Sequence, residues 1–176
     1  MLRPDIGLNY GEFLETINEE DRELIESYYN RSELRKKGLD KVRFINDNLN
    51  IIVFTKPSCK DAASTIPYLL KLASLNDRIK ISFLNREGNE KLLLDATGEE
   101  KVPSFVIVDY QGETIRKYIE FPKGVKEFLL TTKVEDTQSV IDTMREGKYD
   151  DLIQEDLVRF LTGENYEYIR FDRKDK

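Results

Sequence analysis

The chain opens with hydrophobic positions at helical spacing. Between residues 8 and 37 apolar side chains recur three and four positions apart among charged ones, a pattern that predicts two amphipathic helices. Gly38 is the predicted stop of the second helix. Residues 41–48 predict a third short helix or an irregular approach, ending in the turn-forming residues 46–48. The N-terminal part of the chain is therefore expected to be helical.

The middle of the chain predicts a mixed sheet. Residues 51–54, Ile-Ile-Val-Phe, form a continuous β-branched and aromatic run, as expected of a strand buried on both faces. A strand–helix–strand unit and a hairpin turning at Gln111 and Gly112 account for the patterns that follow. The predicted elements are a helix over 59–75, a strand over 79–84, a short helix over 89–96, and hairpin strands over 104–109 and 113–119.

Helical spacing returns in the last third of the chain. After Pro122 the apolar positions predict a helix over 125–130 and two further helices, of which the last stops at Gly163. The tail, residues 166–176, is expected to be half-ordered at best.

Nothing in the chain separates it into independent domains. The sequence has no internal repeat, low-complexity segment or Gly/Ser linker, and 176 residues suffice for one hydrophobic core. We therefore expect one packed domain with three parts: an N-terminal helical extension (1–48), a core (49–131) and a C-terminal helical extension (132–176).

Composition narrows the classes of function. One cysteine cannot form an internal disulfide, and the absence of histidine excludes the usual zinc clusters. A net charge of −6 disfavours nucleic-acid binding, and no run approaches the roughly 20 apolar residues of a membrane-spanning helix. The first residues lack a basic and apolar leader, so we expect a cytoplasmic protein. Because the chain has one cysteine and no histidine, we also expect no metal and no resident cofactor.

Cys59 is the candidate reactive group. It stands in the first turn of a predicted helix, where unpaired backbone N–H groups and the helix dipole favour a thiolate. Lys56 and Lys60 add positive charge nearby, whereas Asp61 opposes ionisation of the thiol. The residues alone leave open whether Cys59 is a nucleophile or an inert, buried thiol.

The order of these motifs resembles the thioredoxin-like family. The resemblance covers about residues 49–131: a strand, then Cys59 opening a helix, Pro67 within that helix, and Val102-Pro103 before a hairpin. It implies a thioredoxin-like α/β fold of three layers, a central mixed sheet flanked by helices, here with extra N- and C-terminal helices. It also implies a cis peptide bond at Pro103, facing Cys59 across a substrate groove, and a helix kinked at Pro67.

Within this family, the segment after the first strand is similar to a poorly characterised bacterial branch whose motif reads Trp-Cys-Gly-Asp followed by Ala, Ser or Cys. Cys59, Asp61 and Ala62 match that motif, whereas Ser58 and Lys60 depart from it. The match implies a site with a single cysteine.

Three departures from thioredoxin itself change the chemistry that the resemblance implies. Ala62 stands where the resolving cysteine would be, and Val53 stands where thioredoxins carry a buried carboxylate for proton transfer. Ser58 replaces a tryptophan and so removes an aromatic wall beside the cysteine. A mixed disulfide at Cys59 would therefore need an external thiol to resolve it.

A second resemblance, to glutaredoxins, concerns Lys56. The segment FTKPSC is similar to a glutaredoxin strand end, where a lysine contacts the glutathione carboxylate, and monothiol glutaredoxins need only one cysteine. Lys101 departs from that family's threonine, its Gly-Gly pair is missing, and Pro67 follows the thioredoxin pattern instead. The alternative for Lys56 is a solvated lysine at a strand end.

Three functions are open from the sequence. Cys59 can be the catalytic group of a monothiol thiol–disulfide oxidoreductase, meeting a protein disulfide or a small thiol such as glutathione as co-substrate. Alternatively, the domain is a non-catalytic binding or adaptor module that docks an extended peptide beside the cis-proline, or its extensions cover the groove or mediate dimerisation. The residues expected to contact a substrate or partner are Lys56, Lys60, Asp61, Val102 and Pro103.

Overall fold

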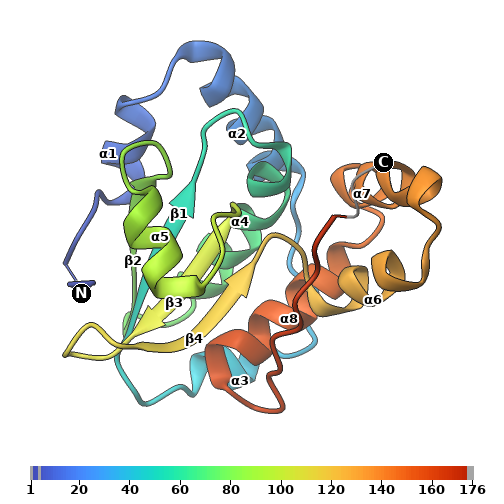
Figure 1. The fold of residues 1–176 in the computed structure, drawn as a ribbon. Coiled ribbons are helices and arrows are strands. Elements are labelled where there is room, and N and C mark those ends of the chain that lie inside the picture. Colours follow the sequence, from blue (N-terminus) through green and yellow to red (C-terminus); the bar gives the residue numbers. More distant parts are fainter. Residues whose placement is uncertain (1, 4, 174–176) are drawn as a thin grey trace.

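The centre of the molecule is a four-stranded mixed sheet (Figure 1). The structure is a computed structural model that describes residues 2, 3 and 5–173. The strands follow the order β2-β1-β3-β4, with β1 parallel to β2 and antiparallel to β3, and β4 antiparallel to β3. Their bounds are β1 Leu49–Thr55, β2 Ile79–Asn85, β3 Ser104–Val108 and β4 Thr114–Ile119. This arrangement confirms the predicted mixed sheet.

The continuous apolar runs of the sequence lie on the two central strands. Every residue of β3 is buried, as is all of β1 except Asn50. The reason is that both strands lie at the centre of the sheet, with a strand on either side and an apolar layer on each face. Alternate side chains enter two apolar layers. One layer contains Ile51, Val53, Phe105 and Ile107, and the other contains Ile52, Phe54, Val106 and Val108.

Helices cover both faces of the sheet, which confirms the predicted α/β class. Helix α5 and Leu2 pack on the second layer, and the remaining helices gather on the first (Figure 1). Pro67 lies inside α4. No helix in residues 2–3 and 5–173 is long and apolar enough to cross a membrane. The helices are α1 Tyr10–Glu15, α2 Glu19–Arg31, α3 Leu39–Arg43, α4 Lys60–Ala73, α5 Glu90–Thr97, α6 Lys123–Thr131, α7 Thr137–Arg145 and α8 Asp150–Thr162, with a 3-10 turn at Val134–Asp136.

The predicted end of the second helix is wrong. Helix α2 ends at Arg31, because Ser32 turns to an extended conformation while its N–H still bonds the Tyr28 carbonyl. Gly38 instead precedes α3, where its φ of 84° is in the left-handed region that glycine adopts without a Cβ penalty. The residues between α2 and α3 thus form a loop rather than a helical turn.

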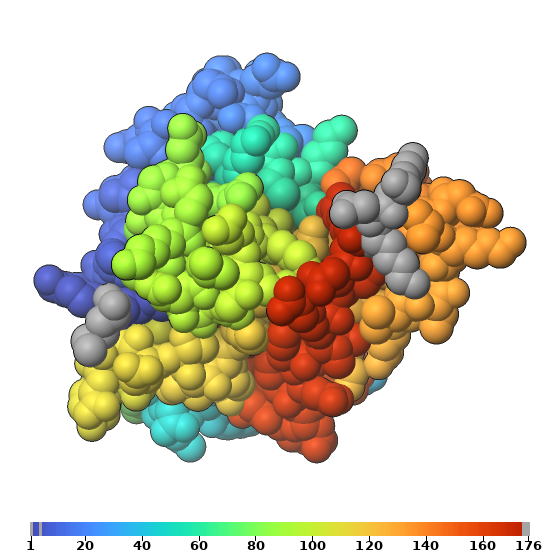
Figure 2. All heavy atoms as spheres, viewed as in Figure 1, coloured from blue at the N-terminus to red at the C-terminus, as the bar shows by residue number. Residues whose placement is uncertain are grey.

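The tail packs against the rest of the fold as far as residue 173. It has no helix or strand, yet Phe171 is only 5% exposed and meets the Phe121 ring edge-on at 6.3 Å. Figure 2 shows the red C-terminal segment in the seam between the green and yellow residues of the sheet side and the orange helices α6 and α7. An extended segment has no helical periodicity from which to infer this packing. The expectation for residues 174–176 lies outside the described residues.

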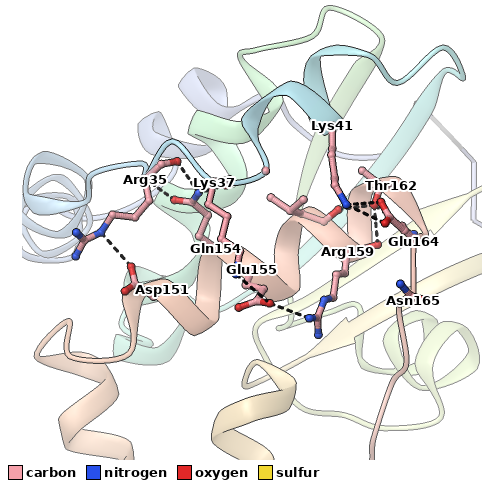
Figure 3. A pocket seen from close by; sticks show the side chains of 12 residues that line it. Arg35, Lys37, Lys41, Asp151, Gln154, Glu155, Arg159, Thr162, Glu164 and Asn165 are labelled. Carbon is pink, nitrogen blue, oxygen red and sulfur yellow. Dashed lines mark hydrogen bonds and ion pairs between the residues drawn. The ribbon is translucent and has the colours of Figure 1, made fainter.

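Gln154 of α8 holds the loop between α2 and α3 in place (Figure 3). Its buried side chain accepts a hydrogen bond from the Arg35 N–H at 2.7 Å and donates to the carbonyls of Arg35 and Lys37 at 2.8 and 3.0 Å. The ion pairs around it are exposed and contribute little. One amide therefore satisfies three backbone groups and joins the N-terminal extension to the C-terminal one.

Replacing Gln154 with alanine should destabilise the protein by about 1–3 kcal/mol, because the loop's backbone groups would lose their partners at a partly buried place. The matched control is Gln138→Ala, since Gln138 is exposed and its amide bonds the exposed Asp142 of the same helix. That change should stay within about 0.5 kcal/mol. Urea unfolding measures both, and equal, small effects would contradict this role of Gln154.

Candidate functional site

Cys59 lies at the junction between β1 and α4. Its N–H donates to the Lys56 carbonyl at 2.9 Å, which closes a tight turn after the strand, and its carbonyl accepts from the Ala63 N–H at 2.9 Å. It is thus the N-cap residue of α4, and its side chain is half-buried. The first turn of α4 directs its unpaired N–H groups toward the thiol, as the sequence predicts.

The segment around Pro103 meets this cysteine. The Val102–Pro103 peptide bond is cis, and the Cys59 Sγ lies 3.8 Å from the Val102 carbonyl oxygen. Pro103 is buried, and its carbonyl accepts a hydrogen bond from the Glu120 N–H at 2.7 Å. In the described part of the chain, neither the N–H nor the carbonyl of Val102 makes a backbone hydrogen bond. Half-buried Val102 therefore has no backbone partner, and its carbonyl accepts a hydrogen bond only from the Cys59 thiol among the described residues.

Asp61 is buried directly behind the cysteine and is held by two arginines. The Arg145 guanidinium binds it through two hydrogen bonds, with Nε to Oδ1 at 2.8 Å and Nη2 to Oδ2 at 3.1 Å. The Arg173 Nη2 lies 3.6 Å from the same Oδ2. Both arginines belong to the C-terminal extension. We refer to Cys59, Asp61, Val102 and Pro103 together as the thiol surface.

The electrostatics of this place keep the thiol protonated. Burial raises the pKa of Cys59, and the Asp61 carboxylate raises it further. The backbone N–H groups of Ala62 and Asp61 and the Arg145 guanidinium lower it, but the net direction is upward. A raised pKa leaves less thiolate, which is the nucleophilic form.

The two predicted lysines do not join the thiol surface. Lys56 and Lys60 are both exposed, and the cation that acts on the thiol is Arg145. Lys56 instead faces a cavity of about 460 Å³ that Arg86 also lines and that Cys59 does not. The structure therefore brings together four of the six predicted site residues, Cys59, Asp61, Val102 and Pro103.

Glu120 is a site residue that the sequence analysis did not single out. Its side chain is only 9% exposed, Arg173 pairs with its Oε1 at 3.0 Å, and its backbone bonds Pro103. Burial raises the pKa of this carboxyl, with Asp61 adding to the shift and Arg173 opposing it. Val53, at the position of the thioredoxin carboxylate, is fully buried hydrocarbon. Glu120 is thus a buried carboxylate next to the thiol surface.

No sequence pattern identifies the partners of Asp61 and Glu120. The chain has 28 lysines and arginines, and Arg145 follows Asp61 by 84 residues. The available signal was the position of Asp61 on an otherwise apolar helix face, since a buried carboxylate requires a cation or several donors. Which lysine or arginine pairs with Asp61 is determined by the folded structure.

A cavity away from the thiol surface is chemically self-contained (Figure 3). It has a volume of about 600 Å³ and lies between the loop before α3 and helix α8. Each cation in it pairs with a carboxylate of the same cavity, and it contains no nucleophilic thiol, so we place the candidate site at the thiol surface. The pairs are Arg35 with Asp151, Lys37 and Arg159 with Glu155, and Lys41 with Glu164.

Comparisons with known proteins identify the type of fold. A family model described as Thioredoxin matches residues 7–140. A protein of unknown function from Pseudomonas aeruginosa has a similar structure, with a TM-score of 0.73 and 14% identity over 90% of this chain and 94% of that one. An HIV epitope-scaffold has a TM-score of 0.74 and 15% identity over 91% of this chain and 95% of its own. No curated protein matches the sequence.

Removing Arg145 should destabilise the protein by about 3 kcal/mol, because Asp61 would stay buried without its bidentate partner. In the double variant Asp61→Asn with Arg145→Met, most of that loss should be recovered, since no unpaired charge is left. Arg159→Met is the control, because Arg159 pairs with Glu155 on the surface and should cost under about 0.5 kcal/mol. Urea unfolding of the wild type, Arg145→Met, Asp61→Asn, the double variant and Arg159→Met tests this, and additive effects of the two single changes would contradict it.

Alkylation of Cys59 by iodoacetamide should have its pH midpoint above that of the same cysteine in the urea-unfolded chain. The reason is that burial and Asp61 both raise the pKa of the folded thiol. Asp61→Asn should move the midpoint down, while Asp95→Asn, on an exposed part of α5, should leave it in place. A folded midpoint below the unfolded one would show that the helix N-terminus dominates instead.

Proposed function

This chain belongs to the thioredoxin family, and on that premise we propose that it is a docking module which binds an extended peptide of a partner protein at the thiol surface. The observation that carries the proposal is Val102, whose backbone N–H and carbonyl make no backbone hydrogen bond in residues 2–3 and 5–173. An extended peptide can pair with such an edge by strand addition.

The position of this edge limits where a peptide can pair. From Ser104 onward β3 is bonded to β1 on one side and to β4 on the other, so its interior has no free edge. A guest peptide can instead pair with the backbone of Val102, which lies just before the buried Pro103 and the start of β3. Ser58, next to Cys59, is exposed and small, so a side chain of the guest peptide has room beside the cysteine.

The chemistry of the site supports binding over turnover. The raised pKa of Cys59 keeps the thiol in its less reactive form. Ala62 supplies no resolving thiol, and Val53 supplies no proton-transfer group. In this proposal the cysteine serves as a small, half-buried contact of the bound peptide.

A second candidate function is monothiol exchange, which the approach of the Cys59 Sγ to the backbone next to Pro103 favours. In that reaction the Cys59 thiolate attacks one sulfur of a disulfide, forms a mixed disulfide and releases the other sulfur as a thiolate. With a glutathionylated peptide, Cys59 attacks the glutathione sulfur and releases the peptide thiolate. A second glutathione then attacks that glutathione sulfur, which forms oxidised glutathione and releases the Cys59 thiolate. A lone reduced cysteine suits the reducing cytoplasm, where we propose that either function takes place.

Two substitutions at one position separate these functions. Cys59→Ser removes the thiol and keeps the surface open, whereas Cys59→Tyr removes the thiol and covers the surface. With nonapeptides selected on the wild-type protein from a displayed library, docking predicts affinities within about twofold for Cys59→Ser and a loss of at least about tenfold for Cys59→Tyr.

Monothiol exchange predicts a different result, because reduction of a glutathionylated peptide in the presence of glutathione would then disappear in both variants. Peptide affinities that are equal in all three proteins would rule out docking at the thiol surface. Circular dichroism melting of each variant checks that the fold is intact before the affinities are compared.

A further inference from the structure

The C-terminal segment 166–173, which we call the strap, borders the thiol surface. The Arg173 side chain reaches Asp61 at 3.6 Å and Glu120 at 3.0 Å. The Lys101 Nζ, two residues before Pro103, binds the Phe171 carbonyl and the Asp172 carboxylate, the latter at 3.0 Å. The strap therefore touches the loop before the cis-proline, the turn after β4 and the first turn of α4.

The strap is attached in the manner of a bound peptide. It pairs with no strand, and its carbonyls are bound by side chains, with the Lys126 Nζ donating to the Ile169 oxygen at 2.9 Å. Its apolar anchor is Phe171, which is buried against Phe121. Further contacts come from the hydroxyl of Tyr166, which donates to the Lys117 carbonyl at 2.7 Å. A separate peptide with the same side chains could make all of these contacts.

Closure of the strap buries charges at a cost. Lys126, Glu120 and Glu99 are each less than 8% exposed although charged groups prefer water. Burial lowers the pKa of Lys126 to about 8 and raises that of Glu120. The Glu120 Oε2 is buried without a hydrogen-bond partner among the described residues. Opening returns water to these groups, which offsets the loss of the Phe171 contact.

The backbone below the strap also carries strain. Glu120 has a φ of 65°, in the left-handed region that costs energy for any residue with a Cβ. By contrast, Asp61 keeps its bidentate Arg145 partner when Arg173 leaves, so the cysteine turn stays satisfied in the open state. Release of the strap therefore leaves the cysteine turn with its own partner.

We propose that the strap occupies the place next to the thiol surface at which a partner protein binds. A partner segment with an aromatic side chain followed by an acidic and a basic residue displaces it. This inference rests on the docking function proposed above. The aromatic ring takes the place of Phe171 on Phe121, and the guest's carbonyl and carboxylate take the Lys101 amine. The guest backbone then continues from the half-buried Lys101 to Val102, whose N–H has no backbone partner among the described residues.

The test uses the acetylated octapeptide of the strap's own sequence, YEYIRFDR, with a fluorescent label, and anisotropy with the full chain. Phe171→Ala releases the strap's anchor, so this variant should bind the octapeptide at least about tenfold more tightly than the wild type. Phe44→Ala is the matched control, because Phe44 is 77% exposed and should behave as wild type. An octapeptide with alanine in place of its phenylalanine should lose the affinity.

Hydrogen exchange provides a second measurement that needs no peptide. In Phe171→Ala, exchange should accelerate at the hydrogen-bonded amides of Glu120, Phe121 and Lys126 and stay unchanged in β1 and β2. Unchanged exchange together with equal octapeptide affinity for both proteins overturns the strap inference, while the Cys59→Tyr comparison still tests docking. Faster exchange throughout the chain also overturns it, because Phe171 would then be a part of the general core.

Discussion

The ion pair between Asp61 and Arg145 is the constraint on which the arrangement of the site depends. A carboxylate buried in the first turn of α4 is tolerated only with a cation held in a fixed geometry, and α7 supplies it. The same contact holds the C-terminal extension against the cysteine turn. It also places a negative charge two residues from the thiol, so the electrostatics of Cys59 follow from a structural requirement of the helix.

The position of Cys59 and its electrostatics point to different kinds of chemistry. A helix N-terminus and a neighbouring cis-proline are the setting of a reactive thiol, and the chain has both. Burial and Asp61 outweigh these features, so the pKa of the thiol rises. The Val102 N–H, which has no backbone partner among the described residues, does not depend on that balance, which is why binding is the function that this geometry supports best.

Much of the fold follows from local patterns, whereas the site follows from them only in part. The buried run at residues 51–54 and the hairpin around Gly112 are visible because strand burial and turn chemistry are local properties. Cys59 and Pro103 are recognisable by their order along the chain. Arg145, Glu120 and the packed tail are not, since charge pairing across the fold and an extended segment leave no periodic signal. Gly38 misled the prediction because glycine can both end one helix and begin the next.

The late position of Arg145 in the chain has a consequence for how the protein is made. During synthesis, β1 and the first turn of α4 leave the ribosome well before α7, so Asp61 spends that time without its cation. Burying the carboxylate alone would be unfavourable, so the nascent helix stays loosely docked with its cysteine in water. Final packing of α4 then waits until the C-terminal extension has emerged, which makes the newly made chain the form in which Cys59 is most open to oxidants and chaperones.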